Sequence, residues 1–327
     1  MPKPGRIALG LFASGAACLC LAATESSAQA YPARPVHILV GFAAGGATDV
    51  IARQVAQKLT ESIGQPVIVE NHPGAATAIA TDRLAKSRAD GYTLLLMPIS
   101  TAVQSALRKD LPYDLERDVA AVSQVASGPF VLVVHPLVPA RNVKELIAFA
   151  QPQPGKLSYG TPGVGSAHHL VTEMFNSRTN LKTVHVPFKG AADADLATAS
   201  GQLQMSFTSP AGALPFLERG RIRPLAVTSA TRLSLLPAVP TLDESGLPGF
   251  DYSAWYGLSA PASTPKNVIA QLNAAVNKIV HTPEMKEILN KQGFEPQTGT
   301  PEEFAALVRR EVEQTTKLIQ ITGMKAE

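Results

Sequence analysis

Residues 36–59, VHILVGFAAGGATDVIARQVAQKL, place an apolar run, a glycine-rich turn and an amphipathic pattern directly one after another. The apolar run predicts a strand over residues 36–41, and the amphipathic pattern predicts a helix over residues 48–63. Further short apolar runs alternate with helical patterns along the chain, which is typical of a sheet covered by helices. The stretch therefore predicts an α/β fold.

The turn between this strand and this helix has the composition of an anion site. Gly45 and Gly46 can adopt positive φ and approach a ligand closely, and Thr48 or Asp49 is expected to cap the helix. The unpaired N–H groups at the start of the helix then face outward, with the positive end of the helix dipole behind them. Because the turn contains no Lys or Arg, neutral donors would hold the anion, which suits a small carboxylate.

The alternation of strands and helices continues to the end of the chain. Further strands are expected over residues 66–70, 92–97, 120–126, 130–134, 157–160, 183–186, 203–208, 225–228 and 252–258. Further helices are expected over residues 76–88, 142–150, 166–177, 191–200, 213–219, 266–281 and 301–320, so two helices finish the chain. The pattern predicts mostly parallel sheets flanked by helices, with the loops that follow the strands gathered at one sheet edge.

A second stretch, LSYGTPGVGSAHHL over residues 157–170, repeats the sequence of strand, glycine turn and helix. Gly163 and Gly165 precede Ser166, whose hydroxyl is expected to cap the helix. The pair Gly128-Pro129 before an apolar run indicates a domain crossing, and the proline- and glycine-rich residues 235–250 indicate the return connection. Two lobes are therefore predicted, each with an anion-binding turn: residues 31–130 with 249–327, and residues 131–248.

The first thirty residues have the composition of an export signal. Lys3 and Arg6 precede an apolar run, and Ala28-Gln29-Ala30 forms a cleavage site, so we expect residues 1–30 to be removed and the rest to function in the periplasm. The 327 residues carry a net charge of +3, and both cysteines lie in the signal. This balance argues against nucleic acid and membrane-surface partners, and disulfides and thiolate metal sites are excluded. We expect no metal, no cofactor and a monomer.

Enzymatic patterns are weak. Ser166 does not lie in G-x-S-x-G, since Val164 stands two residues before it. His168 and His169 point about 100° apart on a helix and cannot share a metal, although one of them is a candidate for lining a cleft. A secreted serine hydrolase that uses Ser166 and a nearby histidine stays open as the alternative function.

The remaining polar residues favour structural roles. The spacing Gly41, Gly45, Gly46 differs from the dinucleotide fingerprint. The other histidines, at positions 37, 72, 135, 185 and 281, are scattered and are interpreted as structural. Asp193 and Asp195 are interpreted as surface residues near the start of a helix.

Nine different short motifs follow one another along the exported chain: GFAAGGATD (41–49), PVIVENHPG (66–74), DGYTLLL (90–96), LPYD (111–114), YGTPGVGSAHHL (159–170), HVPFKG (185–190), LAVTS (225–229), WYGL (255–258) and TPEEF (300–304). Together they resemble the Bug family of bacterial periplasmic solute-binding receptors, which serve tripartite tricarboxylate transporters. The resemblance implies a two-lobed periplasmic-binding-protein fold (Venus flytrap, type II) that closes over a small carboxylate: a dicarboxylate, an acidic amino acid or an aromatic acid. It also implies transporter subunits in the membrane, or a sensor, as the partner and no enzyme activity.

The ligand-binding residues that the resemblance implies lie in the two glycine turns and at two positions beside them. They are Phe42, Ala43, Ala44, Gly45, Gly46, Ala47, Thr48 and Asp49; Thr161, Pro162, Gly163, Val164, Gly165, Ser166, Ala167 and His168; and Ser100 and Thr208. The sequence departs from the family pattern in three places. Gly41 stands where proline is usual, residues 76–78 (Ala-Thr-Ala) replace a common Gly-Gly-Asn, and Thr208 replaces a common Asp or Asn. The last two departures lie where the middle of the ligand is expected to be recognised.

Overall fold

The structure is a computed structural model, and it describes residues 31–326. The predicted export signal, residues 1–30, lies outside the described residues. Within the described part, no helix combines the length and apolar character needed to cross a membrane.

Six strands form the first sheet, in the order β11-β4-β10-β3-β1-β2. Their bounds are Val36–Val40 (β1), Val67–Asn71 (β2), Thr93–Pro98 (β3), Val119–Pro129 (β4), Ser253–Pro261 (β10) and Glu295–Pro296 (β11). Strand β1 pairs in parallel with β2 and β3, whereas β10 runs antiparallel to both β3 and β4. The loops that follow β1, β2 and β3 therefore open at the same edge of this sheet.

Five strands form the second sheet, in the order β7-β6-β8-β5-β9. Their bounds are Val131–Val134 (β5), Ser158–Thr161 (β6), Val184–Pro187 (β7), Met205–Thr208 (β8) and Arg223–Val227 (β9). Strand β6 pairs in parallel with β7 and β8, and β5 runs antiparallel to β8 and β9. The α/β fold class is confirmed, but the expectation of mostly parallel sheets is wrong, because antiparallel strands enter both sheets where the chain crosses between them.

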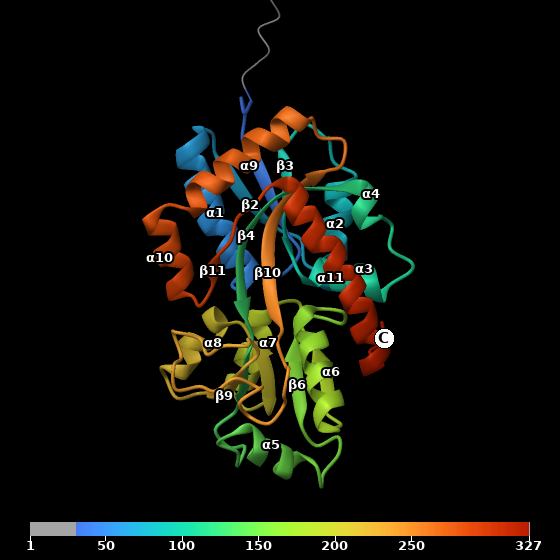
Figure 1. The fold of residues 1–327 in the computed structure, drawn as a ribbon, viewed down its shortest axis with the longest axis vertical. Coiled ribbons are helices and arrows are strands. Elements are labelled where there is room, and N and C mark those ends of the chain that lie inside the picture. The colour runs from blue at the N-terminus through green and yellow to red at the C-terminus, as the bar shows by residue number, and fades with distance from the viewer. Residues whose placement is uncertain (1–30, 327) are drawn as a thin grey trace, which may run out of the picture. The chain divides into compact units, whose positions relative to one another are not determined.

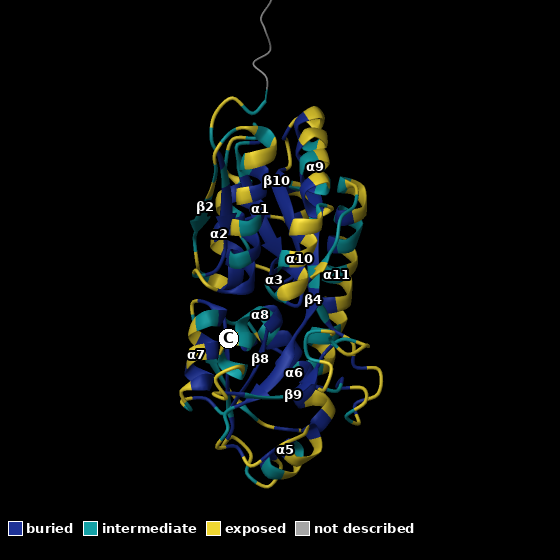
Figure 2. Ribbon diagram, turned by 90° about the vertical axis from the view of Figure 1, so that its left-hand side faces the viewer, coloured by how far each residue is buried: buried dark blue, intermediate teal, exposed yellow. Residues whose placement is uncertain are grey.

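Helices cover both sheets (Figure 1). Those beside the first sheet are Ala47–Ile63 (α1), Ala78–Ala85 (α2), Ser100–Leu107 (α3), Leu115–Asp118 (α4), Lys266–Val280 (α9), Pro283–Lys291 (α10) and Pro301–Thr322 (α11). Those beside the second sheet are Val143–Ala150 (α5), Ala167–Thr179 (α6), Ala191–Ala199 (α7) and Pro210–Leu217 (α8), and a 3₁₀ turn, Ala75–Thr77 (η1), precedes α2. Figure 2 shows buried strands between helices whose outward faces are exposed, as the hydrophobic effect requires.

Three short helices were not predicted from the sequence. They are α3, α4 and α10, so three helices rather than two finish the chain. Helix α3 begins at Ser100, soon after β3, and its N-cap is Ile99, an apolar residue that cannot cap the helix with its side chain. A helix of this length without a capping residue has only a weak sequence signal.

The chain crosses from the first sheet to the second at Phe130, next to the predicted Gly128-Pro129 crossing, and returns between β9 and β10. The Phe130 N–H donates to Thr228 Oγ1 at 2.8 Å, and the Thr228 N–H donates to the Phe130 carbonyl at 3.0 Å. Thr228 Oγ1 in turn donates to the Tyr252 carbonyl at 2.6 Å. These bonds join the crossing segments side by side. Helix α11 adds a further link, since it packs against α3 and also contacts α6.

Candidate ligand-binding site

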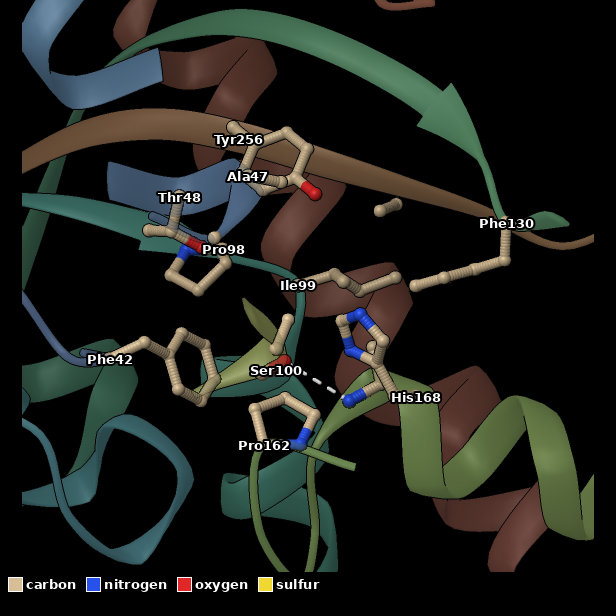
Figure 3. A pocket seen from close by; sticks show the side chains of 14 residues that line it. Phe42, Ala47, Thr48, Pro98, Ile99, Ser100, Phe130, Pro162, His168 and Tyr256 are labelled. Carbon is tan, nitrogen blue, oxygen red and sulfur yellow. Dashed lines mark hydrogen bonds between the residues drawn. The ribbon is translucent and has the colours of Figure 1, made fainter. Parts of the chain in front are cut away.

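A cavity of about 20 Å³, called the ligand cavity below, lies where loops of the two sheets meet (Figure 3). Its wall combines the turn after β1, the start of α3, the Phe130 crossing, the turn after β6, the start of α7 and strand β10. The lining residues are Phe42, Gly46, Ala47, Thr48, Pro98, Ile99, Ser100, Phe130, Pro162, Ala167, His168, Ala191, Ala254 and Tyr256. None of these is Asp, Glu, Lys or Arg, so the wall offers apolar surface with neutral polar groups.

The first glycine turn, residues 41–49, leaves the start of α1 without a side-chain cap. The N-cap is Gly46, and α1 begins at Ala47. The expectation that Thr48 or Asp49 caps the helix is wrong, because Asp49 lies inside the first turn and is buried. The backbone N–H groups of Ala47 and Thr48 donate no hydrogen bond among the described residues. They are therefore available to an acceptor in the ligand cavity.

Asp49 has an internal role in this turn. Its carboxylate accepts hydrogen bonds from the Gly45 N–H at 3.0 Å, from Arg53 at 2.9 and 3.0 Å, and from Asn71 at 2.9 Å. Burial on its own would raise the pKa of Asp49, but the hydrogen bonds from Arg53, Gly45 and Asn71 outweigh it and lower the pKa. Asp49 holds the turn in shape and does not line the ligand cavity.

A second uncapped helix start faces the first one across the ligand cavity. The N-cap of α7 is Gly190, and a glycine has no side chain that could cap the helix. A Cβ built on Gly46 would lie 3.5 Å from Ala191 Cβ and 3.8 Å from the Ala191 nitrogen. The Ala43 N–H donates to the Lys189 carbonyl at 3.3 Å and holds the two segments together. Ala191 was not predicted from the sequence, although Lys189-Gly190 before a helical pattern is a signal that could have identified it.

The second glycine turn, residues 161–168, is already bonded. Ser166 Oγ accepts the His169 N–H at 3.2 Å, which confirms the predicted cap of α6. The Ala167 N–H donates to Ser100 Oγ at 3.0 Å (Figure 3), and Gln104 Nε2 donates to the Val164 carbonyl at 2.7 Å. The last two bonds join α3, which lies beside the first sheet, to this turn, which belongs to the second-sheet side. This turn therefore connects the two sheets.

Ser166 lacks the surroundings of a nucleophile. Among the hydrogen bonds of residues 31–326, none joins Ser166 Oγ to an imidazole ring. A serine nucleophile requires a base within hydrogen-bond reach of its oxygen. The geometry favours a cap and gives the hydrolase alternative no support.

His168 is the polar side chain that the second glycine turn presents to the ligand cavity. Its ring packs edge-on against Phe130, with 4.8 Å between the ring centroids. Both ring nitrogens are shielded from solvent and have no hydrogen-bond partner among the described residues. Burial lowers the pKa of His168 to about 4, so the ring is neutral near pH 7.

His169 and His185 form a stacked pair, which agrees with the interpretation of His185 as a structural residue. Their ring centroids are 4.0 Å apart, and His185 also stacks on Tyr159. Burial lowers the pKa of His169 to about 3, with a further contribution from His185, and burial lowers the pKa of His185 to about 4. His169 Nδ1 accepts the Gly165 N–H at 3.3 Å, so this neutral pair supports the second glycine turn.

Asp195 and Thr208 lie together away from the ligand cavity. Asp195 is 6% exposed, so its interpretation as a surface residue is wrong. Helix α7 packs against β6, β8 and α8, which leaves it little free surface. Burial raises the pKa of Asp195 to about 7, and the nearby Thr208 hydroxyl partly opposes this rise. Thr208 therefore lies near a buried carboxyl group and does not line the ligand cavity.

Two departures from the family pattern contact each other. A Cβ on Gly41 would lie 2.7 Å from the Thr77 Cα, so a larger residue at position 41 would clash with the backbone of η1. Ala75, Ala76 and Thr77 have φ values of 44°, 43° and 92°, in the region that favours glycine. The glycine at position 41 thus accommodates a strained turn at positions 75–77.

Eight of the fourteen residues that line the ligand cavity were predicted from the sequence. The predicted residues that line it are Phe42, Gly46, Ala47, Thr48, Ser100, Pro162, Ala167 and His168. The predicted residues outside the wall are Ala43, Ala44, Gly45, Asp49, Thr161, Gly163, Val164, Gly165, Ser166 and Thr208. Pro98, Ile99, Phe130, Ala191, Ala254 and Tyr256 were not predicted. The described residues contain no cluster of His, Cys, Asp and Glu that could hold a metal ion.

Comparison with known proteins identifies relatives over nearly the whole chain. The family described as "Tripartite tricarboxylate transporter family receptor" matches residues 51–324. Protein BugT of Bordetella pertussis is 36% identical over 305 residues, which cover 93% of this chain and 94% of BugT. A protein of R. palustris solved with adipate has a TM-score of 0.88 at 33% identity, covering 90% of this chain and 99% of that one. The periplasmic binding protein BugD has a TM-score of 0.87 at 31% identity, with the same coverage.

These matches confirm the resemblance drawn from the motifs. They confirm the periplasmic-binding-protein fold, because the structures of the R. palustris protein and BugD align with almost their full length. They also confirm a transporter receptor, which is a binding protein and not an enzyme.

Proposed function

Because the chain belongs to the tripartite tricarboxylate transporter receptor family, we propose that it captures a small organic carboxylate between its two sheets. The observation that carries this proposal is the meeting of two uncapped helix starts, those of α1 and α7, at one cavity without a charged side chain on its wall. Helix N-termini bind anions through free N–H groups and the helix dipole. The adipate in the R. palustris relative supports a carboxylate as the ligand class.

In this proposal the carboxylate lies between the N–H groups at the start of α1, around Thr48, and those at the start of α7, around Ala191. Each hydrogen bond to a charged acceptor contributes roughly 1.5 to 3 kcal/mol. A few such bonds, less the cost of ordering the ligand and closing the protein, give a dissociation constant on the order of micromolar. His168 is neutral, and its ring has no hydrogen-bond partner among residues 31–326, so it supplies a further hydrogen-bonding group at the wall.

Ligand capture requires movement at the crossing. A cavity of about 20 Å³ has room for little more than one water molecule. We propose that the predicted lobes, residues 31–130 with 249–327 and residues 131–248, separate about the crossing at Phe130, Thr228 and Tyr252. Three hydrogen bonds between the sheets re-form on closure: Ser100 with Ala167, Gln104 with Val164, and Ala43 with Lys189. A ligand that contacts both helix starts stabilises the closed form.

The same proposal includes the compartment in which the ligand is bound and the proteins that recognise the closed form. Residues 1–30 would export the chain to the periplasm, where the relative BugD is described as a binding protein. The closed form would then be recognised, as a monomer, by membrane subunits of a tripartite transporter or by a sensor. No cofactor takes part in this cycle.

Isothermal titration calorimetry of the exported chain against a panel of mono- and dicarboxylates, acidic amino acids and aromatic acids tests the proposal. We expect saturable binding of at least one carboxylate, with no turnover of the esters of the same acids. Absence of binding across the panel would contradict the carboxylate assignment. Ester hydrolysis that disappears in Ser166→Ala would instead favour the hydrolase alternative.

A further inference from the structure

Helix α7 carries a buried carboxyl group one turn after a residue that lines the ligand cavity. Ala191 is the first residue of α7 and lines that cavity, and Asp195 follows four residues later. Side chains four residues apart lie on the same face of a helix, with their Cβ atoms about 5–6 Å apart. A carboxylate bound at the start of α7 would therefore lie roughly two helical turns, or about 10 Å, from Asp195 at most.

Hydroxyl groups surround the Asp195 carboxyl group. A Cβ built on Gly212 would lie 2.5 Å from Asp195 Oδ2 and 2.8 Å from Thr208 Oγ1. The same point would lie 3.2 Å from Ser209 Oγ, so three oxygen atoms gather around it. Thr208 Oγ1 is buried and has no hydrogen-bond partner among the described residues, and Asp195 forms no ion pair with any of them.

None of the elements packed against α7 turns a charged side chain toward Asp195. These elements are β6, β8 and α8, and the last two contain no titratable residue. In β6, Gly160 faces α7, whereas Tyr159 points to the opposite face of the sheet and donates to Glu173 of α6. On α7 itself, the other acidic residue, Asp193, is exposed. An ionised Asp195 therefore has no compensating charge.

The titratable groups near the ligand cavity do not supply that charge either. Asp49 and Arg53 on α1 pair with each other at 2.9 Å. Burial lowers the pKa of His168 to about 4, so this ring is neutral near pH 7. Lys189, before the start of α7, is exposed, and solvent screens its charge. Burial accordingly raises the pKa of Asp195 to about 7, where a second negative charge nearby decides whether the group is ionised.

We infer that Asp195 is a proton-binding site linked to the ligand site, so that the protein takes up a proton from solvent when a carboxylate binds at the start of α7. Two negative charges on one face of a helix, with no cation between them, repel each other strongly in a buried environment. The proton forms an O–H bond on a carboxylate oxygen of Asp195 and removes one of the two charges. Linkage then makes binding tighter as the pH is lowered through neutrality. This inference rests on the proposed function and adds a proton to what the protein captures.

Titration calorimetry of the exported chain with adipate, and with the other acids of the panel that bind, measures the proton uptake. Phosphate and Tris release a proton with very different enthalpies, so the difference between the two buffers gives the number of protons taken up. Near pH 7.5 we expect on the order of half a proton per ligand, and an affinity that falls about threefold from pH 7 to pH 8. The acids stay ionised over this range, since the usual pKa of a carboxyl group is about 4.

Asp195→Asn should abolish the proton uptake and make the affinity constant from about pH 7 to 8, because an amide does not titrate in this range. Asp193→Asn is the matched control, since Asp193 is an exposed acid in the first turn of the same helix, and it should leave the uptake unchanged. His168→Gln should also retain the uptake, whatever its effect on affinity. Infrared difference spectra of the wild type need no variant: adding ligand near pH 8 should produce the band of a protonated carboxyl group.

Proton uptake that persists in Asp195→Asn, or that disappears in His168→Gln, would overturn the assignment to Asp195 and leave the proposed function intact. Carboxylate binding by the wild type without proton uptake, and without the infrared band, would have the same consequence. A wild type that binds no acid of any kind would overturn the proposed function and this inference together.

Discussion

The two glycine turns look alike in sequence but differ in their hydrogen bonds. The first turn ends at Gly46 and leaves the start of α1 without a side-chain cap. The second turn ends at Ser166, which caps α6 itself, and Ser100 accepts the next N–H, that of Ala167. The first turn can therefore donate the first N–H groups of its helix to a ligand, whereas the Ala167 and His169 N–H groups of the second turn are bonded within the protein.

This difference reassigns the second half of the anion site. On the side of the second sheet, the helix start without a side-chain cap is that of α7, next to Ala191, whereas Ser166 caps the helix that follows the second glycine turn. The second turn instead links to α3 through Gln104 and Ser100. We therefore propose that α1 and α7 bind the anion while the second glycine turn acts as a latch.

The largest expected effect comes from filling the space between the two helix starts. In Gly46→Val, the new side chain would project toward Ala191, into the ligand cavity. We expect carboxylate affinity to fall at least about 100-fold, or about 2.7 kcal/mol. Ala44→Val is the control, since Ala44 is exposed in the same turn and does not line the ligand cavity. Calorimetry measures both affinities, and a Gly46→Val affinity equal to that of the wild type would contradict the assignment.

The two turns should also respond to acid in different pH windows. Burial lowers the pKa of His168 to about 4, from about 6.5 in an unfolded chain. Between these values the unfolded state binds more protons, so the free energy of unfolding falls as the pH is lowered from 6.5 to 4. In His168→Gln this slope should decrease by about 1.4 kcal/mol per pH unit, as measured by urea unfolding. A slope equal to that of the wild type would contradict the burial of a neutral His168.

In the first turn, Asp49 is the residue whose titration should affect the pH dependence of unfolding. Its pKa is lowered by Arg53, Gly45 and Asn71 against the effect of burial, so its stabilising contribution is present above the usual pKa of Asp and is lost at lower pH. In Asp49→Asn, the free energy of unfolding should therefore fall less as the pH is lowered below about 4 than it does in the wild type, as measured by urea unfolding.

Asp195 affects the pH dependence of unfolding in the opposite direction, because its raised pKa, about 7, makes the native state bind more protons between about pH 4 and 7.

Weakening the latch should have an intermediate effect. Gln104→Ala removes the hydrogen bond to the Val164 carbonyl, which forms only when the two sheets are close. We expect affinity to fall about tenfold, because one buried hydrogen bond contributes about 1 to 1.5 kcal/mol to the closed form. Small-angle X-ray scattering with saturating ligand should show a larger radius of gyration than for the wild type. Unchanged affinity and size would remove the latch from the account.

Exchanging the caps tests the comparison most specifically. Ser166→Ala should lower the free energy of unfolding by about 1 kcal/mol and leave carboxylate affinity within about threefold of the wild type. Gly46→Ser should raise stability by a few tenths of a kcal/mol, since its extended backbone suits a serine cap, and should weaken binding because the hydroxyl competes for the α1 N–H groups. Urea unfolding and calorimetry measure both. Stronger loss of binding in Ser166→Ala than in Gly46→Ser would reverse the proposed roles.

The last prediction concerns the strained turn, where the expected effect is on stability. Ala76→Gly should raise the free energy of unfolding by about 1 kcal/mol, because φ of 43° is unfavourable for alanine. Ala270→Gly, at an exposed position inside α9, should lower it by roughly 0.5 to 1 kcal/mol. Opposite signs in urea unfolding would establish the strain, and equal signs would exclude it.

The sequence identified what depends on local pattern. The strand, turn and helix over residues 36–63 and the Ser166 cap follow from residues close to one another in the chain. The role of Ala191 could not be predicted from the sequence, because it depends on α7 facing α1 in the folded protein. The direction of β10 could not be predicted either, since an apolar run does not indicate the direction of a strand. Asp195 is buried by three neighbouring elements, which its own helix pattern does not reveal.

The most direct test of the account is a crystal structure of the exported chain with a bound carboxylate. We predict carboxylate oxygens within hydrogen-bond distance of backbone N–H groups at the start of α1, near Thr48, and at the start of α7, near Ala191. Ser166 and Ser100 should keep their bonds to the second glycine turn. A carboxylate held by the N–H groups of the second glycine turn, with the start of α7 making no contact, would contradict the account.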